Sequence, residues 1–351
     1  MLSGRLDEAQ VQELSADLSI ALASPFALGG KRILIGSTTG FCHYPSMADS
    51  AEDVYERADF ALYAAKEGCR GGMLVFRQEH KLEMAQTSAL ERALREANID
   101  KEFSLHFQPQ YSLLESKVIG FEALARWTSP ELGSVPPDKF IPVAERSGLT
   151  RSLTVSLFRK AVDAALNWPD HVGLAFNLSA QDLRDSDLCN TLLAVIDAAG
   201  LSHERVEFEI TETSVMRDVS ASLQFLACLK SAGCRIALDD FGKGYSSFEQ
   251  LQALPLDKIK IDRAFVSRVQ TDAMSRELVV AMIGLCQAVG LKCVLEGVET
   301  TEDLNCLRSL KGDLIQGYVI GRPAPLGNLS KFLIDAPGED LTPRMSSSAE
   351  R

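Results

Sequence analysis

Residues 206–212 read VEFEITE, and acidic and apolar side chains alternate along this stretch. Because successive side chains of a β-strand point to opposite faces, Glu207 and Glu209 share one face, and Phe208 and Ile210 share the other. Such a strand suits a sheet that packs its apolar face under helices. We therefore expect the acidic face to point into the interior of a barrel.

Similar strand-like runs occur on both sides of this stretch, from residue 102 to about residue 334. Seven further apolar runs end in polar groups: SLHFQPQ (104–110), GFEALAR (120–126), GLAFNLS (173–179), RIALDD (235–240), KIKID (258–262), CVLEGVE (293–299) and LIQGY (314–318). Strands that alternate with helices are typical of a βα barrel or a doubly wound sheet. Barrel enzymes build their active sites from polar groups at the carboxyl ends of successive strands. The pattern thus predicts an α/β fold with a site at that end.

Composition and charge narrow the class of protein. The 351 residues are 46% hydrophobic and 24% charged, which excludes collagen-like and mainly disordered chains. A net charge of −12 disfavours binding to DNA, RNA or acidic membranes, because such binders carry a basic surplus. The longest apolar run, Leu278 to Cys286, is about half of a membrane span, and the first residues show no apolar signal segment. We expect a cytoplasmic protein without a membrane span.

The cysteines and histidines give no sign of a disulfide framework or a zinc site. The eight cysteines contain no CxxC pair, and several lie in apolar strand or helix patterns, so we expect reduced core thiols. The five histidines show no HxxxH spacing. Any metal would therefore be held by oxygen ligands.

The expected rim of the barrel carries a surplus of negative charge. Its carboxylates are Glu122, Glu209, Glu212, Asp239, Asp240, Asp262, Glu296 and Glu299. Arg126 and Lys260 oppose them, and so many carboxylates cannot stay ionised together in a pocket without cations. Oxygen ligands, including the amide of Asn177, favour hard divalent ions such as Mg²⁺ or Mn²⁺.

Two of these carboxylates are adjacent in sequence. Asp239 and Asp240 can both reach one site only if the chain turns there, and the segment FGKG at 241–244 supplies such a turn. An aspartate at such a corner can bridge two metal ions, which is the arrangement used for displacement at phosphorus.

These motifs, in this order, resemble those of the EAL-domain family. The likeness covers about residues 102–334 and rests on EALAR (122–126), FNLS (176–179), EITE (209–212), DDFGKGYSS (239–247), KIKID (258–262), EGVE (296–299) and QGY (316–318). That family consists of phosphodiesterases that open cyclic di-GMP to linear pGpG on a TIM-like (β/α)8 barrel with one antiparallel strand. The resemblance therefore implies this fold, this activity and cyclic di-GMP as the ligand.

The resemblance also implies a role for each matching residue. One divalent ion would be held by Glu122, Asn177, Glu209 and Asp239, and the second by Asp239, Asp240 and Glu296. The catalytic set is Lys260, Glu122 and Glu299, in which Lys260 orients or activates the attacking water. The substrate-binding set is Gln108, Leu124, Arg126, Asp262 and Gln316. Glu212 would steady the loop that follows Asp239, and Gln316 and Glu299 would bind waters beside the metals. Ca²⁺ should inhibit, because its looser coordination misplaces the water.

Residues 1–78 resemble the C-terminal half of a GGDEF, or diguanylate cyclase, domain. The likeness rests on IGSTTGFCHYP (35–45) and ADFALYAAKEGCRG (58–71). The cyclase signature is absent, since neither Gly-Gly pair is followed by the acidic residues that hold the metals of GTP. We expect a small, partial α/β segment without cyclase activity.

The remaining boundaries follow from composition. Residues 79–101 are expected to form a polar connector helix, residues 102–334 the barrel, and the Ser/Pro-rich tail 335–351 a disordered segment. One departure from the family is Lys243, where a small residue is usual, and it bears on the loop more than on the chemistry.

Three hypotheses about function stay open at this point. The first is an active cyclic di-GMP phosphodiesterase, and the second is a receptor that binds the nucleotide without hydrolysing it and signals through a partner. The third is a generic metal-dependent barrel hydrolase. Receptors of this family type lose metal ligands, whereas the set here is complete, so the enzyme is favoured. The resemblance also suggests a homodimer formed through the barrel near residues 239–247.

Overall fold

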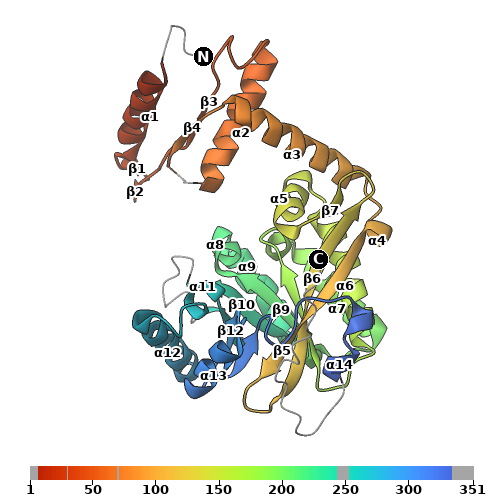
Figure 1. Cartoon of the computed structure of the whole chain (residues 1–351). Coiled ribbons are helices and arrows are strands. Elements are labelled where there is room, and N and C mark those ends of the chain that lie inside the picture. Colours follow the sequence, from red (N-terminus) through yellow and green to blue (C-terminus); the bar gives the residue numbers. More distant parts are fainter. Residues whose placement is uncertain (1–6, 30, 69–70, 243–252, 334–351) are drawn as a thin grey trace, which may run out of the picture. The chain divides into compact units, whose positions relative to one another are not determined.

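The computed structural model describes residues 7–333 apart from residues 30, 69–70 and 243–252, and divides the chain into two compact units, Met1–Arg92 and Ala93–Arg351 (Figure 1). The expected disordered tail and Lys243 therefore lie outside the described residues. The division at Arg92 falls within α3 (Gln78–Glu96). The helix expected over residues 79–101 ends earlier than predicted, because Asn98 caps a separate short helix, α4 (Ile99–Glu102).

The N-terminal unit is built from helices and short strands. Its elements before α3 are α1 (Glu8–Ala23), β1 (Phe26–Leu28), β2 (Lys31–Ile33), β3 (Thr39–Phe41), α2 (Ala51–Gly68) and β4 (Met73–Val75). Helix α2 begins with a reciprocal exchange in which Ser50 and Asp53 each accept the other's backbone N–H. Strands β3 and β4 pair in parallel beside α2. The approach requires Gly40, because a Cβ there would lie 2.2 Å from the carbonyl oxygen of Ala58.

The C-terminal unit alternates strands with helices, as the sequence predicts. Its strands are β5 (Phe103–Ser112), β6 (Lys117–Ser129), β7 (Gly133–Val135), β8 (Gly173–Leu178), β9 (Val206–Thr211), β10 (Arg235–Phe241), β11 (Lys258–Ile261), β12 (Lys292–Glu296) and β13 (Leu314–Gln316). Its helices after α4 are α5 (Pro137–Ser147), α6 (Thr150–Ala165), η1 (Asp182–Arg184), α7 (Ser186–Ala199), η2 (His203–Arg205), α8 (Glu212–Arg217), α9 (Val219–Ser231), α11 (Arg263–Val266), α12 (Ala273–Ala288), α13 (Thr301–Ser309), η3 (Leu326–Asn328) and α14 (Ser330–Leu333).

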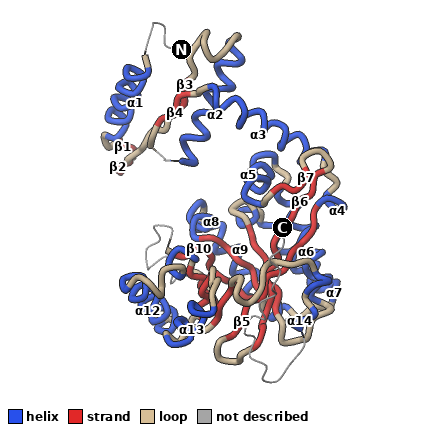
Figure 2. Tube along the Cα trace, viewed as in Figure 1, coloured by secondary structure: helices blue, strands red, loops and turns tan. Residues whose placement is uncertain are grey.

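Eight of these strands close into a barrel in the order β5-β13-β12-β11-β10-β9-β8-β6, and β6 pairs back onto β5. Strand β5 runs antiparallel to both of its neighbours, whereas the pairs from β6 round to β13 are parallel. Strand β7 extends β6 outside the closed ring. Figure 2 shows the strands at the centre and the helices around them. The predicted TIM-like (β/α)8 barrel with one antiparallel strand is confirmed.

The two faces predicted for VEFEITE are present in the barrel wall. Phe208 of β9 is fully buried, and its ring packs on Phe158 of α6 with the ring centroids 5.3 Å apart. Glu209 points the other way and meets Lys260 of β11 inside the barrel. The apolar face thus packs under helices and the acidic face lines the interior, as expected.

The prediction of reduced thiols is wrong for two of the eight cysteines. Cys189 of α7 and Cys228 of α9 form a disulfide across 39 residues of sequence. Helices α7 and α9 are neighbours, so two cysteines without a recognisable spacing come together. The free thiols are those of Cys42, Cys234, Cys286, Cys293 and Cys306, and Cys69 lies outside the described residues.

Each helix in the described ranges is too short or too polar to cross a lipid bilayer.

Candidate functional site

A cavity of about 250 Å³ lies at the carboxyl ends of the parallel strands. It is lined by Gln108, Glu122, Asp239, Lys260, Asp262, Arg263, Glu296, Gly297, Glu299, Gln316, Gly317 and Tyr318. These residues belong to β5, β6, β10, β11, β12 and β13 or to the segments that follow them. The cavity therefore lies where barrel enzymes build their sites.

The ammonium of Lys260 is the point on which the carboxylates of the cavity converge. Its Nζ lies 2.7 Å from Oε2 of Glu209, 2.8 Å from Oε1 of Glu296, 3.3 Å from Oε2 of Glu122 and 3.6 Å from Oδ1 of Asp239. The lysine side chain is only 1% exposed. Four strands thus bring acidic groups that lie far apart in the sequence close together at one buried point.

Glu122 is held by two amides in addition to the Lys260 ammonium. Nδ2 of Asn177 donates to its Oε1 at 2.7 Å, and Nε2 of Gln316 donates to its Oε2 at 2.5 Å. The amide of Gln316 also donates to Oε1 of Gln108 at 3.2 Å. Oε1 of Gln316 is buried and receives no hydrogen bond from the described residues. A buried acceptor without a donor is costly, and this one suits a cation or a water molecule.

The charges around Lys260 do not balance. Burial, aided by the charge of Glu122, raises the pKa of Glu209 well above its ordinary value. Burial also raises the pKa of Asp239, and raises that of Glu296 to about 7. Burial favours a higher pKa for Glu122 too, but Lys260 and the amide hydrogen bonds outweigh it and lower that pKa. Burial opposes the charge of Lys260, yet the surrounding carboxylates raise its pKa well above the ordinary value. One ammonium therefore does not neutralise this group.

The donor set fits hard divalent cations. Carboxylate and amide oxygens are the ligands that Mg²⁺ and Mn²⁺ prefer, and further positive charge would stabilise the ionised carboxylates. Over the described parts of the chain, no three His, Cys, Asp or Glu side chains are already arranged as metal ligands. The Lys260 ammonium lies among the carboxylates of the cavity. The chemistry of the residues therefore fits a divalent metal ion.

The chain turns at Asp239 and Asp240, as the sequence predicts. Asp240 has φ +57°, in the left-handed region that few residues other than glycine adopt, and its N–H donates to Oδ1 of Asp239 at 2.8 Å. Gly242 follows with φ +98°, and a Cβ there would lie 2.9 Å from the ring of Phe265. The turn directs Asp239 into the cavity, whereas Asp240 is not among the described residues that line it.

Most of the predicted site residues come together. Those that line the cavity are Gln108, Glu122, Asp239, Lys260, Asp262, Glu296, Glu299 and Gln316. Asn177 and Glu209 contact this group directly. Arg126 is half-buried, and Glu122 lies close enough to act on its charge. Leu124, Glu212 and Asp240 are not among the lining residues in the described part of the chain. The roles of all the predicted site residues stay predictions.

Sequence reasoning missed several residues of the site. Arg263 and Tyr318 also line the cavity. The signal that could have found them was their position at strand ends, since Arg263 directly follows the predicted run KIKID and Tyr318 ends the predicted run LIQGY. A second polar group, Gln110, Glu207 and Lys258, lies buried beneath the cavity. Each of these three residues lies two positions from a predicted site residue on the same strand and therefore points to the same face. That spacing was the signal that could have found them.

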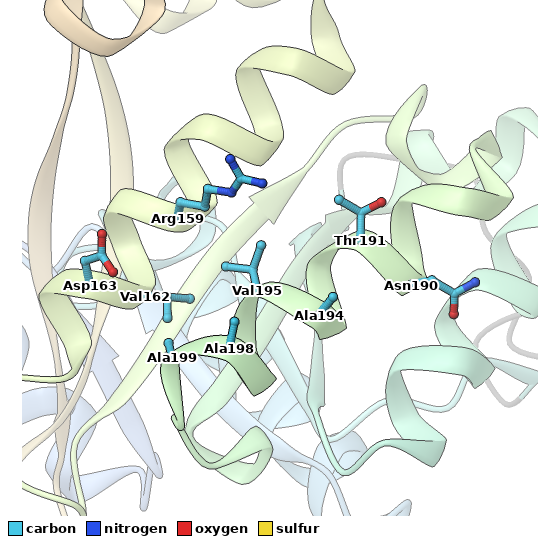
Figure 3. Close-up of a pocket in the computed structure, with 9 residues that line it drawn as sticks. All are labelled: Arg159, Val162, Asp163, Asn190, Thr191, Ala194, Val195, Ala198 and Ala199. Carbon is cyan, nitrogen blue, oxygen red and sulfur yellow. The ribbon is translucent and has the colours of Figure 1, made fainter.

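A larger hollow of about 720 Å³ lies between α6 and α7, on the outside of the barrel (Figure 3). Small apolar side chains, among them Val162, Ala194 and Val195, line much of it, and Arg159 and Asp163 project from α6. The predicted site residues do not line this hollow. Its polar groups do not converge on one point, so we assign no chemistry to it.

Comparison with known proteins gives matches along most of the chain. The EAL domain family model matches residues 91–323. The chain is 39% identical over 331 residues to an uncharacterized signaling protein from Caulobacter vibrioides, covering 94% of this chain and 41% of that protein. It is 33% identical over 324 residues to the cyclic di-GMP phosphodiesterase NbdA from Pseudomonas aeruginosa, covering 91% of this chain and 41% of that protein. The chain thus spans about two fifths of the length of these curated relatives.

Several solved structures with the same fold are reported with cyclic di-GMP. The PaMucR phosphodiesterase in its c-di-GMP complex matches with a TM-score of 0.65 and 34% identity, covering 69% of this chain and 99% of that one. The FimX EAL domain from Pseudomonas aeruginosa, bound to c-di-GMP, matches with a TM-score of 0.63 and 26% identity, covering 67% of this chain and 96% of that one. Since the family match spans well over half of the chain and coincides with the barrel and its cavity, the chain belongs to the EAL domain family.

Proposed function

We propose that this chain hydrolyses cyclic di-GMP to linear pGpG in a reaction that requires divalent cations. The observation that carries the proposal is the convergence of four carboxylates on one buried ammonium at the floor of a cavity. The names of similar proteins support it, since they include a cyclic di-GMP phosphodiesterase and a phosphodiesterase in complex with the nucleotide.

The proposed cation ligands come from the residues around the cavity. One ion would be held by Glu122, Asn177, Glu209 and Asp239, and a second by Asp239, Asp240 and Glu296. Bound Mg²⁺ or Mn²⁺ would supply Lewis-acid polarisation of the phosphate and make water a better nucleophile at neutral pH.

The protein's own groups orient the reactants. In the proposed reaction a water oxygen bonds to one phosphorus, the P–O3′ bond of that phosphate breaks, and the departing 3′ oxygen gains a proton. Lys260 is proposed to orient or activate the water, because its buried ammonium already donates to carboxylates at the cavity floor. Arg126, Gln108 and Asp262 are proposed to contact the nucleotide. Gln316 and Glu299 are proposed to bind waters beside the cations.

The test is product analysis by chromatography after incubating the purified chain with cyclic di-GMP and Mg²⁺ or Mn²⁺. We expect pGpG to accumulate, and we expect excess chelator to stop its formation. Tight binding of cyclic di-GMP without any product would contradict the proposal and favour a receptor. Hydrolysis that continues in excess chelator would contradict the role of the cations.

Residues 1–78 are proposed to be a partial GGDEF domain without cyclase activity, since the Gly-Gly pairs lack adjoining acidic residues. Incubation of the intact chain with GTP should give no cyclic di-GMP. We also propose a homodimer formed through the barrel, which sedimentation equilibrium would detect; a monomer at all concentrations would contradict it.

A further inference from the structure

A second polar layer lies directly beneath the carboxylates of the cavity. It consists of Gln110, Glu207 and Lys258, whose exposed fractions are 2%, 6% and 7%. Nζ of Lys258 lies 2.7 Å from Oε1 of Glu207 and 3.2 Å from Oε1 of Gln110. Burying an ion pair is costly, and well-packed apolar residues commonly give an equally stable core. A contribution to stability alone therefore does not explain why these buried positions carry polar residues.

Strand geometry places this layer under the cavity floor. Glu207 lies two residues before Glu209 on β9, and Lys258 lies two residues before Lys260 on β11. Residues two apart on a strand point to the same face, so each pair is stacked inside the barrel. Gln110 belongs to β5, which runs the opposite way, so it lies deeper than the earlier residues of that strand.

Gln110 joins the two layers through the two ends of its amide. Its Oε1 accepts from Lys258, and its Nε2 donates to Oε1 of Glu209 at 3.1 Å. The other oxygen of Glu209 accepts from Lys260 at 2.7 Å. An ammonium can only donate, so Lys258 determines which end of the Gln110 amide faces it. The NH₂ end is then left for Glu209, whose carboxylate is held at both oxygens.

We propose that Lys258 acts through Gln110 as a positioning residue that orients the Glu209 carboxylate for a divalent cation, an inference that rests on the function proposed above. Without Lys258 the amide is free to turn over, and its oxygen would then face an oxygen of Glu209. Two acceptors repel each other, so the carboxylate would lose its fixed orientation. Hydrogen-bond partners of metal ligands are worth about 10–100-fold in metal affinity or activity.

The test is titration calorimetry of Mn²⁺ into the full chain after chelator treatment, without nucleotide. Gln110→Met keeps a similar length and removes the donor, so we expect the Kd for Mn²⁺ to rise about 10-fold or more. The double variant Lys258→Met/Glu207→Leu removes both buried charges together, so neither is left unpaired. It should weaken Mn²⁺ binding similarly while keeping its Tm near that of the wild type. At saturating Mn²⁺ both variants should recover most of the wild-type kcat.

Thr154→Val is the matched control for lost stability. The buried Thr154 hydroxyl donates to Asp182 at 3.0 Å, outside the cavity, so its loss should lower Tm and leave Mn²⁺ binding unchanged. A normal Kd in Gln110→Met would overturn the proposal, and so would an equal weakening in Thr154→Val. If Mn²⁺ binds the wild type and the variants with the expected Kd values, yet the wild type releases no pGpG, the proposed function alone would be contradicted. A wild type that hydrolyses while Gln110→Met binds normally would contradict this inference alone.

Discussion

The variant Lys260→Ala tests whether the Lys260 ammonium takes part in catalysis or only neutralises the surrounding carboxylates. In the structure its Nζ lies within 3.6 Å of Glu122, Glu209, Asp239 and Glu296, all of them buried or half-buried. Removing one partner of a buried ion pair costs about 3–5 kcal/mol, because the other charge is left uncompensated. We therefore expect the variant, stripped of cations, to have a clearly lower Tm than the wild type.

Divalent cations should restore much of that stability, since they supply the positive charge that the variant lacks. Activity should not return with it. If Lys260 orients or activates the attacking water, kcat should fall about 10²–10⁴-fold even at saturating Mg²⁺. Affinity for cyclic di-GMP, measured by calorimetry in Ca²⁺, should change little, because other groups bind the phosphates. Lys230→Ala, which removes a partner of Asp257 outside the cavity, is the control and should keep kcat near the wild-type value.

The opposite result would refute this reasoning. A counter-charge competes with cations for the same carboxylates, so its removal would tighten metal binding and leave kcat within a few-fold of the wild type. A variant with that behaviour would remove Lys260 from the mechanism. A large loss of nucleotide affinity would instead place the lysine in substrate binding.

Three further predictions concern the cations, the turn and the disulfide. Excess chelator should abolish hydrolysis and Ca²⁺ should inhibit it, because Ca²⁺ accepts looser coordination than Mg²⁺; full activity in Ca²⁺ would count against this. Asp239→Asn should lower kcat/KM about 100-fold or more at fixed Mg²⁺, and Glu212→Gln much less; equal losses at saturating Mg²⁺ would indicate that the loop is limiting. Reductant should lower the stability of the wild type by about 4 kcal/mol, the chain-entropy value for a loop of 39 residues, and should not affect Cys189→Ser/Cys228→Ser; equal denaturation curves with and without reductant would contradict this.

The barrel could be predicted because each strand carries its own signal. VEFEITE and KIKID alternate apolar and polar residues, so which face looks inward follows from local sequence. What local sequence does not contain is which inward residues meet. Glu209 and Glu296 lie on strands separated by two others in the ring, and their common contact with Lys260 depends on how the whole barrel closes.

Other features depend on neighbours that spacing alone does not reveal. The disulfide joins two helices that are adjacent only in the folded chain, so the absence of a short cysteine spacing was misleading. The depth of Gln110 follows from the reversed direction of β5. The family resemblance implied one antiparallel strand without saying which, and the residues of β5 would fit a parallel strand equally well.

The reversed strand also decides where the chain enters the barrel. In an all-parallel barrel the first strand begins at the end remote from the active site. Here the first residue of β5, Phe103, is in register with Trp127, near the carboxyl end of β6, and Lys160 fixes this entry point by donating to the Phe103 carbonyl at 2.7 Å. The chain thus enters the barrel at the carboxyl ends of the parallel strands, the end at which the cavity lies. From Phe103, β5 runs past Gln108 in the cavity wall before it reaches the opposite end of the barrel.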